Sequence, residues 1–176
     1  MNKEELRAKQ APLKNKYKED PESAIITHHA VGTISKEDLN CSVETFAGNV
    51  VSGLHPAAGG DGSEACSGDM LLESLVACAG VTFKAVSLSM GIEYRKAVIK
   101  AEGDLDFRGT LAVSKDVPVG FKNIRLLFDI ETDEEKEKID KLIELSERYC
   151  VVFQTLKNGV EDISSKFTLI NLRKFY

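Results

Sequence analysis

Apolar residues recur every three to four positions through the middle of the chain, between a glycine-rich segment and Gly91. This spacing is that of one face of an α-helix, and the stripe consists of Leu71, Leu75, Cys78, Thr82 and Val86. The pattern predicts a helix over residues 67–90, with Ser67 as its amino-terminal cap and Gly91 as a left-handed carboxyl-terminal cap. At roughly 1.5 Å per residue this helix would span a small domain. We therefore expect it to be a core element that carries Cys78 on its buried face.

The segments that flank this helix have the period of two that is typical of strands. Residues 97–107 and 124–131 alternate apolar and polar side chains, as strands with one wet face do. Two successive strands without a helix between them favour antiparallel pairing and an α+β fold. Upstream, residues 24–35 and 41–51 are rich in β-branched side chains and are separated by the turn SKEDLN. They predict two further antiparallel strands.

Three more helices and one strand are expected near the two ends of the chain. Asn2 and Glu5 predict a capping box for a first helix, which Pro12 should disturb. Thr132 and Glu135 predict a second capping box, followed by a helix that buries Leu142. An apolar helix should end at residues 158–159, ahead of a strand over 162–172. The chain then divides into an amino-terminal helical arm, residues 1–20, and a single domain, residues 21–176.

Composition narrows the class of protein. The 176 residues are 43% apolar and 29% charged, which is ordinary for a globular domain. A net charge of -5 without a basic stripe argues against a nucleic-acid partner. No uninterrupted apolar run approaches the roughly 18 residues of a membrane span, and the amino terminus lacks the apolar core of a secretory signal. We expect a cytoplasmic protein that has no membrane partner and keeps its cysteines reduced.

The cysteine thiols are the one group of side chains in the sequence that suggests a shared reactive chemistry. The sequence contains no HExxH, GxSxG, CxxC or phosphate-loop motif, and its three histidines lack metal-ligand spacing, so we expect no metal and no cofactor. A thiolate is favoured by a cation, by hydrogen-bond donors or by a helix amino terminus. Cys150 is the candidate partner of Cys78, because a sulfenic acid can condense with a second thiol within bonding reach. The periodicity leaves open whether a helix begins at Cys150, and both cysteines could instead be small core residues.

At these residues the chain resembles a known family. The run SGDMLLESLVACAGVTF, the two strands after it, the acidic-capped helix and ERYCVVFQTL resemble the OsmC/Ohr family of osmotically inducible and organic hydroperoxide resistance proteins. The likeness extends over about residues 24–172. It implies an α+β intertwined homodimer with antiparallel sheets packed on a long central helix. It also implies a thiol peroxidase that reduces organic hydroperoxides at the expense of a dithiol, with Cys78 peroxidatic, Cys150 resolving and Asp69 as the assisting acid.

The sequence departs from the family pattern in ways that keep other functions open. In peroxide-reducing relatives an arginine from the amino-terminal strand region stabilises the thiolate, but residues 24–45 contain none. Asp69 is displaced by one position from the usual acid and can also serve as a helix cap. A cation could come instead from Arg7, His28, His29 or Arg95. The alternatives are a dimeric OsmC-like binding protein without turnover, which the missing arginine favours, and a redox sensor that forms the disulfide as a signal.

Overall fold

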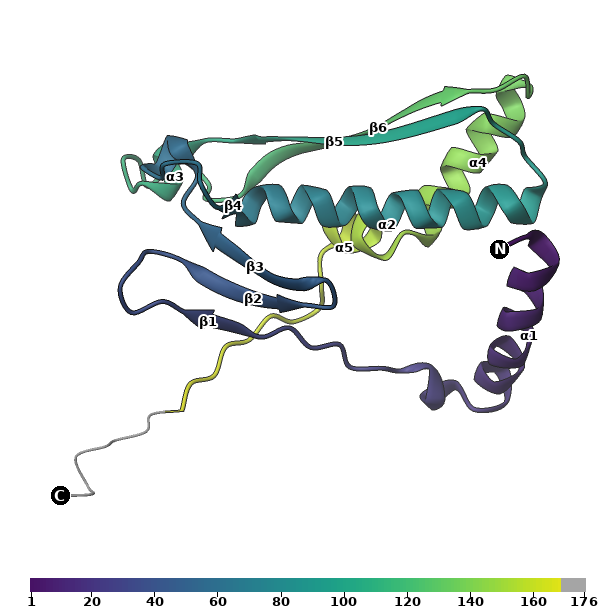
Figure 1. Ribbon diagram of the computed structural model, residues 1–176, viewed down its shortest axis with the longest axis horizontal. Coiled ribbons are helices and arrows are strands. Elements are labelled where there is room, and N and C mark those ends of the chain that lie inside the picture. Colours follow the sequence, from purple (N-terminus) through teal and green to yellow (C-terminus); the bar gives the residue numbers. More distant parts are fainter. Residues whose placement is uncertain (169–176) are drawn as a thin grey trace.

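One long helix, α2, organises the chain, as a computed structural model that describes residues 1–168 shows (Figure 1). Helices α4 and α5 and the ribbon β5–β6 surround part of α2, whereas β1, β2 and β3 lie to one side of it. The helices are α1 (Lys3–Glu19), α2 (Ser67–Met90), α3 (Phe107–Thr110), α4 (Lys136–Tyr149) and α5 (Val151–Asn158). The strands are β1 (Gly32–Ile34), β2 (Cys41–Thr45), β3 (Gly48–Gly53), β4 (Ala65–Cys66), β5 (Lys96–Leu105) and β6 (Phe121–Glu131).

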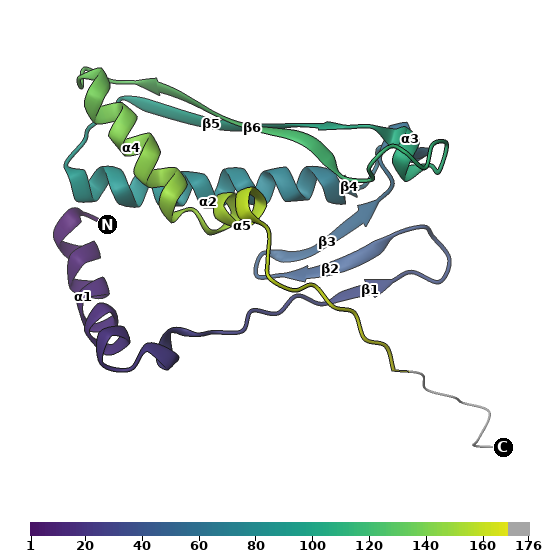
Figure 2. The same cartoon turned by 180° about the vertical axis from the view of Figure 1, so that it is seen from behind.

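The ribbon β5–β6 is antiparallel, as the alternation predicts. Its register runs from Lys96 opposite Glu131 to Leu105 opposite Phe121, with a bulge at the end near Asp104. Apolar side chains of both strands, including Ile99, Leu126 and Phe128, pack against the buried residues of α2, whereas the charged side chains and Leu127 are exposed. Figure 2 shows α4 and α5 from the other side, in front of the same helix. The predicted α+β class is confirmed, with the antiparallel ribbon packed on the central helix.

The buried stripe of α2 differs from the predicted one by a rotation of about one residue. The fully buried positions are Leu75, Ala79, Phe83 and Ser87, which are four apart. Cys78, Thr82 and Val86 are only half-buried, at the edge of this stripe. The small side chains of Ala79 and Ser87 let neighbouring elements approach the helix closely. A pattern of apolar residues does not reveal this effect. The prediction that Cys78 sits on the buried face is therefore wrong in part, and its sulfur lies at the border of the core.

The helix ends confirm some of the expected caps and correct others. Gly91 adopts φ 70° and caps α2, and both hydrogen bonds of the Asn2–Glu5 capping box form. Cys66 rather than Ser67 is the amino-terminal cap residue of α2, and α1 continues through Pro12. The Thr132–Glu135 capping box does not form: the Thr132 hydroxyl donates instead to the Glu93 carbonyl, 2.6 Å away. This bond ties the end of β6 to the segment that leads into β5.

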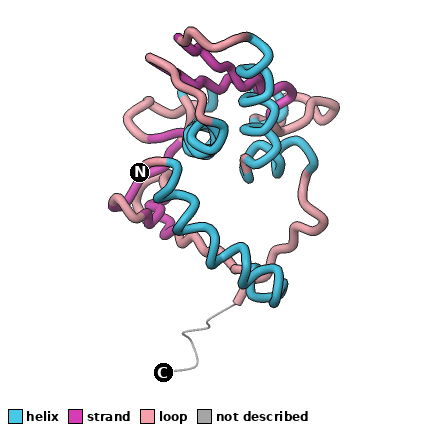
Figure 3. The backbone as a smooth tube through the Cα atoms, turned by 90° about the vertical axis from the view of Figure 1, so that its right-hand side faces the viewer, coloured by secondary structure: helices cyan, strands magenta, loops and turns pink. Residues whose placement is uncertain are grey.

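The amino-terminal part of the chain forms a separate small sheet of order β1-β2-β3-β4. The first three strands are antiparallel and β4 joins β3 in parallel. The strand expected over 24–35 shrinks to residues 32–34, and the one expected over 41–51 is a hairpin of β2 and β3. Figure 3 shows α1 as a separate arm, and none of its residues is buried. The expected last strand is absent over residues 162–168, and residues 169–172 lie outside the described part of the chain.

Helix α2 is long and apolar enough to cross a membrane when only length and composition are considered. The sequence-based exclusion of such a segment was therefore too strict, because it required an uninterrupted apolar run. In its most apolar window of 18 residues, 22% of the residues are buried. One side of α2 packs on β5, α4 and α5, as expected for a core helix, whereas side chains such as Val81 on its other side remain exposed.

Candidate thiol site

The structure brings Cys78 and Cys150 into one cluster. Cys78 lies near the middle of α2, and Cys150 lies at the corner between α4 and α5, where its side chain is fully buried. Both pack with Leu75 and Ala79. Cys150 is both the carboxyl-terminal cap of α4 and the amino-terminal cap of α5. Periodicity had left open whether the chain breaks at this residue. A helix does begin directly after Cys150.

The amino terminus of α5 adjoins the cluster that holds Cys78. The first amides of a helix have no partner within the helix, and here those of Val152 and Val151 lower the pKa of the Cys78 thiol. The amide of Phe153 donates instead to the Cys150 sulfur, at 3.5 Å. The corner is held by Gln154, whose side-chain nitrogen donates to the Glu147 carbonyl at 2.8 Å. The first turn of α5 therefore supplies donors to both thiols.

These contacts shift the pKa values of the two thiols in opposite directions. Burial raises the pKa of Cys78, but the Val152 amide, the Cys150 thiol, the Val151 amide and the Thr82 hydroxyl together bring it below its usual value. Burial also raises the pKa of Cys150, and the neighbouring Cys78 raises it further. Of the two thiols, that of Cys78 is therefore the more acidic. This order of acidity is the one expected if Cys78 is the nucleophile and Cys150 is the thiol that reacts second.

The thiolate at Cys78 is stabilised by neutral donors. Within residues 1–168, none of the groups that set its pKa is a cation. Of the four candidate cations, Arg95 pairs with Asp133 at 2.5 Å, and His28 and His29 lie exposed in the segment before β1. Arg7 lies on the exposed surface of α1. The same described range holds no cluster of three His, Cys, Asp or Glu side chains able to bind a metal ion.

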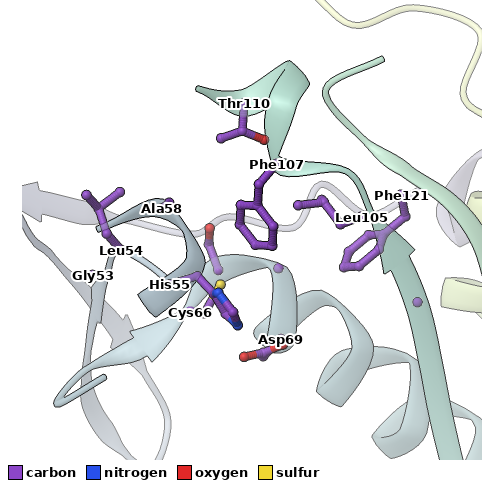
Figure 4. A pocket seen from close by; sticks show the side chains of 13 residues that line it. Gly53, Leu54, His55, Ala58, Cys66, Asp69, Leu105, Phe107, Thr110 and Phe121 are labelled. Carbon is purple, nitrogen blue, oxygen red and sulfur yellow. The ribbon is translucent and has the colours of Figure 1, made fainter. Parts of the chain in front are cut away.

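Asp69 does not join the thiol pair. It lies in the first turn of α2, nine residues before Cys78, which corresponds to about 13.5 Å along the helix axis. It lines a different pocket of about 370 Å³, together with His55, Cys66 and Phe107 (Figure 4). His55 stacks on Phe107 with ring centres 5.0 Å apart, and its Nδ1 accepts the Ala57 amide at 3.0 Å. In this chain the acid and the reactive sulfur occupy separate places.

Sequence reasoning found both thiols but missed three of the groups that act on Cys78. Two of them are main-chain amides, which no side-chain pattern reveals. The third, Thr82, stands one turn after Cys78 in the expected apolar stripe, and a hydroxyl in such a stripe was the available signal. Cys41 in β2 and Cys66 at the start of α2 have no part in the thiol pair, and all four cysteines are free.

Comparison with solved structures finds the same fold in several proteins. An OsmC-like protein from Mycoplasma pneumoniae has 15% identity and a TM-score of 0.64, with 76% of this chain and 89% of that chain covered. An organic hydroperoxide resistance protein from Elizabethkingia anophelis has 16% identity and a TM-score of 0.61, with 78% and 92% covered. The organic hydroperoxide resistance protein OsmC from Legionella pneumophila has 16% identity and a TM-score of 0.59, with 77% and 93% covered.

Sequence comparison gives the family directly. No curated protein matches the chain. The family model described as OsmC-like protein matches residues 60–162, which is more than half of the chain and includes both Cys78 and Cys150. With the α+β fold built around α2, this match shows that the chain belongs to the OsmC-like protein family.

Proposed function

We propose that this protein is a thiol peroxidase that reduces organic hydroperoxides through Cys78 and Cys150. The observation that carries the proposal is the pair of thiols in one cluster with pKa values shifted in opposite directions. Family membership and two of the structural neighbours, described as organic hydroperoxide resistance proteins, support a role in resistance to peroxides. Free thiols suit a reducing cytoplasm, where we place the protein.

The proposed reaction has three steps. The Cys78 thiolate attacks one peroxide oxygen, so that an S–O bond forms, the O–O bond breaks, and the alkoxide leaves as an alcohol after taking a proton. The Cys150 sulfur then attacks the Cys78 sulfenic acid, which forms the disulfide and releases water. A dithiol reductant restores both thiols by exchange and becomes a disulfide itself. Each turnover therefore converts one hydroperoxide and one dithiol into an alcohol, water and a disulfide.

The surroundings of the pair favour organic hydroperoxides over hydrogen peroxide. Cys78 and Cys150 are packed among apolar side chains of β5, β6 and α5, including Ile99, Leu126 and Phe153. A groove of about 290 Å³ adjoins this cluster and shares Leu126 and Phe153 with it. An apolar substituent on the peroxide would gain free energy by leaving water here, whereas hydrogen peroxide has no such group to bury.

We also propose that the working form is a homodimer. The outer side of α2 leaves apolar side chains in water, with Val81 74% exposed and Leu71 39% exposed. Apolar side chains of the small sheet and of the segments beside it, including Ile34 and Phe46, are exposed too. Exposed apolar side chains in such number are common at protein interfaces. A second copy of the chain would cover it, as the family resemblance implies.

A second candidate function follows from the neutral surroundings of Cys78. Without a cation, the thiolate could be too sluggish for turnover, and the disulfide could then act as a redox signal or the site could only bind a ligand. Turnover distinguishes these possibilities. Loss of cumene hydroperoxide and of hydrogen peroxide should be followed with a dithiol for the wild type, Cys78→Ser and Cys150→Ser. The proposal predicts faster loss of cumene hydroperoxide that Cys78→Ser abolishes. Stoichiometric oxidation without turnover would instead support the sensor.

A further inference from the structure

The corner between α4 and α5 is a break of one residue in an otherwise helical path, and Cys150 is that residue. Its φ of -79° and ψ of 110° are extended, and the two helices end and begin on either side of it (Figure 2). In a continuous helix the Glu147 carbonyl would accept the Val151 amide. The main-chain hydrogen bonds of residues 1–168 include none between these two groups. The break therefore leaves the Glu147 carbonyl, in the last turn of α4, open to another donor.

Gln154 in α5 supplies that donor. Its side-chain Nε2 donates to the Glu147 carbonyl at 2.8 Å, across the break. Its Oε1 accepts from the Asn158 side chain at 2.9 Å, so the nitrogen is the end of the amide that faces Glu147. The main-chain amide of Gln154 donates to the Cys150 carbonyl, also at 2.9 Å. One half-buried residue therefore connects the last turn of α4, the Cys150 backbone and the end of α5.

This connection limits the movement of the Cys150 side chain. Cys150 is fully buried in one cluster with Leu75 and Ala79, and Cys78 packs against the same cluster. Two cysteines form a disulfide only when their Cβ atoms come within about 3.5–4.5 Å of each other. The direction of the Cys150 side chain depends on how α5 is set against α4. A bond that holds this setting raises the effective concentration of one thiol at the other.

We propose that Gln154 is a positioning residue that holds Cys150 beside Cys78 for disulfide formation. The proposal rests on the thiol pair of the proposed function, because Gln154 acts through Cys150. In that reaction the Cys150 sulfur attacks the sulfur of the Cys78 sulfenic acid, the S–S bond forms, and the hydroxyl leaves with the Cys150 proton as water. Gln154 keeps the attacking sulfur in place and has no part in the earlier attack of Cys78 on the peroxide.

The test measures the equilibrium between the thiol pair and glutathione, and it needs no peroxide. Glutathione disulfide takes two electrons and two protons from Cys78 and Cys150, which leaves the protein disulfide and two glutathione molecules. Cys41 and Cys66 are first replaced by serine, so that only the pair can react. The full chain is equilibrated at a series of glutathione ratios, blocked with an alkylating reagent and weighed intact. The reduced protein then carries two alkyl groups and the disulfide form carries none.

Gln154→Met should lower the equilibrium constant for disulfide formation about three- to tenfold, the range that corresponds to one neutral hydrogen bond. Methionine has a similar length and helix propensity but no donor. Asn158→Ala is the matched control, because it removes the other hydrogen bond of the Gln154 side chain and keeps the one to Glu147. It should leave the constant close to that of the wild type. Gln154→Ala gives the same readout if the methionine variant does not fold.

A merely structural role would not move this equilibrium. If Gln154 stabilised the dithiol and disulfide forms equally, Gln154→Met would lower the urea midpoint of both forms and leave the equilibrium constant unchanged. That result would overturn the proposal. An equal fall of the constant in Gln154→Met and Asn158→Ala would overturn it too, because the bond to Glu147 would then not be the cause.

The outcome can be told apart from that of the proposed function. A lower constant for Gln154→Met in a protein that consumes no hydroperoxide would support the positioning role and contradict the peroxidase. Turnover of cumene hydroperoxide by the wild type, with the same constant in Gln154→Met, would support the peroxidase and overturn the positioning role. A wild type that forms no disulfide between Cys78 and Cys150 at any glutathione ratio would overturn the positioning role as well.

Discussion

The two halves of the chain differ in how far they bury their own apolar residues. Every fully buried apolar side chain of the described residues lies in the body of the fold, residues 67–158, from Leu75 to Cys150. Residues 1–66, which form α1 and the small sheet, bury none, and their exposed apolar side chains include Ile34 and Phe46. The body therefore has a core of its own, whereas the amino-terminal half depends on some other surface to cover it.

The body and the amino-terminal half also differ in what they contribute to the thiol site. The groups that lower the pKa of Cys78 come from α2, α5 and the corner before α5, all in the body. The family resemblance expects an activating arginine from the amino-terminal half, where Arg7 is the one arginine of residues 1–66. The body thus lowers the pKa of the Cys78 thiol with hydrogen-bond donors of its own, without a cation among the described residues.

The largest effect on stability is expected from a cavity in the core of the body. Leu142 has 0% exposure and packs with Phe83 and Ile92. Leu142→Ala should lower the free energy of unfolding by about 2–5 kcal/mol, since it leaves a cavity in a closely packed cluster. Urea denaturation followed by circular dichroism measures this loss. A change close to zero would show that the body is not packed as described.

Ile34→Ala is the matched change in the amino-terminal half, where Ile34 is 77% exposed. A lone chain should lose well under 1 kcal/mol. If a second copy covers β1, the loss should be larger and should depend on protein concentration, because dissociation then precedes unfolding. Denaturation at two concentrations, together with sedimentation equilibrium, separates these results. A monomer at all concentrations would contradict the proposed dimer.

Gly103 tests how tightly the β5–β6 ribbon is packed at the end where Phe121 lies. A Cβ atom on Gly103 would lie 2.6 Å from the ring of Phe121, whereas one on Gly120 would meet nothing within 4 Å. Gly103→Ala should therefore cost about 1–3 kcal/mol of stability through overpacking. Gly120→Ala is the control and should have little effect. Equal midpoints in thermal denaturation of the two variants would contradict the contact between β5 and Phe121.

The smallest effect is expected on the outer face of the ribbon. Arg125 pairs with Glu102 at 3.0 Å and with Asp104 at 2.6 Å, and all three side chains are partly exposed to water. Arg125→Ala should change the urea midpoint only slightly, and the difference should vanish at high salt, because exposed ion pairs are screened. A large loss that persists in salt would show that this face is covered, contrary to the description of the ribbon.

The sequence predicts the body well because its elements repeat a clear period. Helix α2 and the alternation in β5 and β6 were predicted within a few residues. The amino-terminal strands were not, since a short edge strand such as β1 takes its limits from pairing with β2 rather than from its own residues. At the site, the two cysteines stand out by type, whereas the donors at Val151 and Val152 depend on where α5 points. Asp69 stands one position away from a family acid in the sequence, and it lies far along the helix from Cys78.

A disulfide map tests most directly whether Cys78 and Cys150 act as one redox pair. The reduced protein receives one equivalent of cumene hydroperoxide, is blocked with an alkylating reagent and is digested with trypsin without reduction. One dominant disulfide is expected between the peptide of residues 37–84, through Cys78, and that of residues 149–157, through Cys150. In the background lacking Cys41 and Cys66 the same bond should form in equal yield. Oxidation of Cys66 or Cys41 with Cys78 and Cys150 left as free thiols would contradict the account.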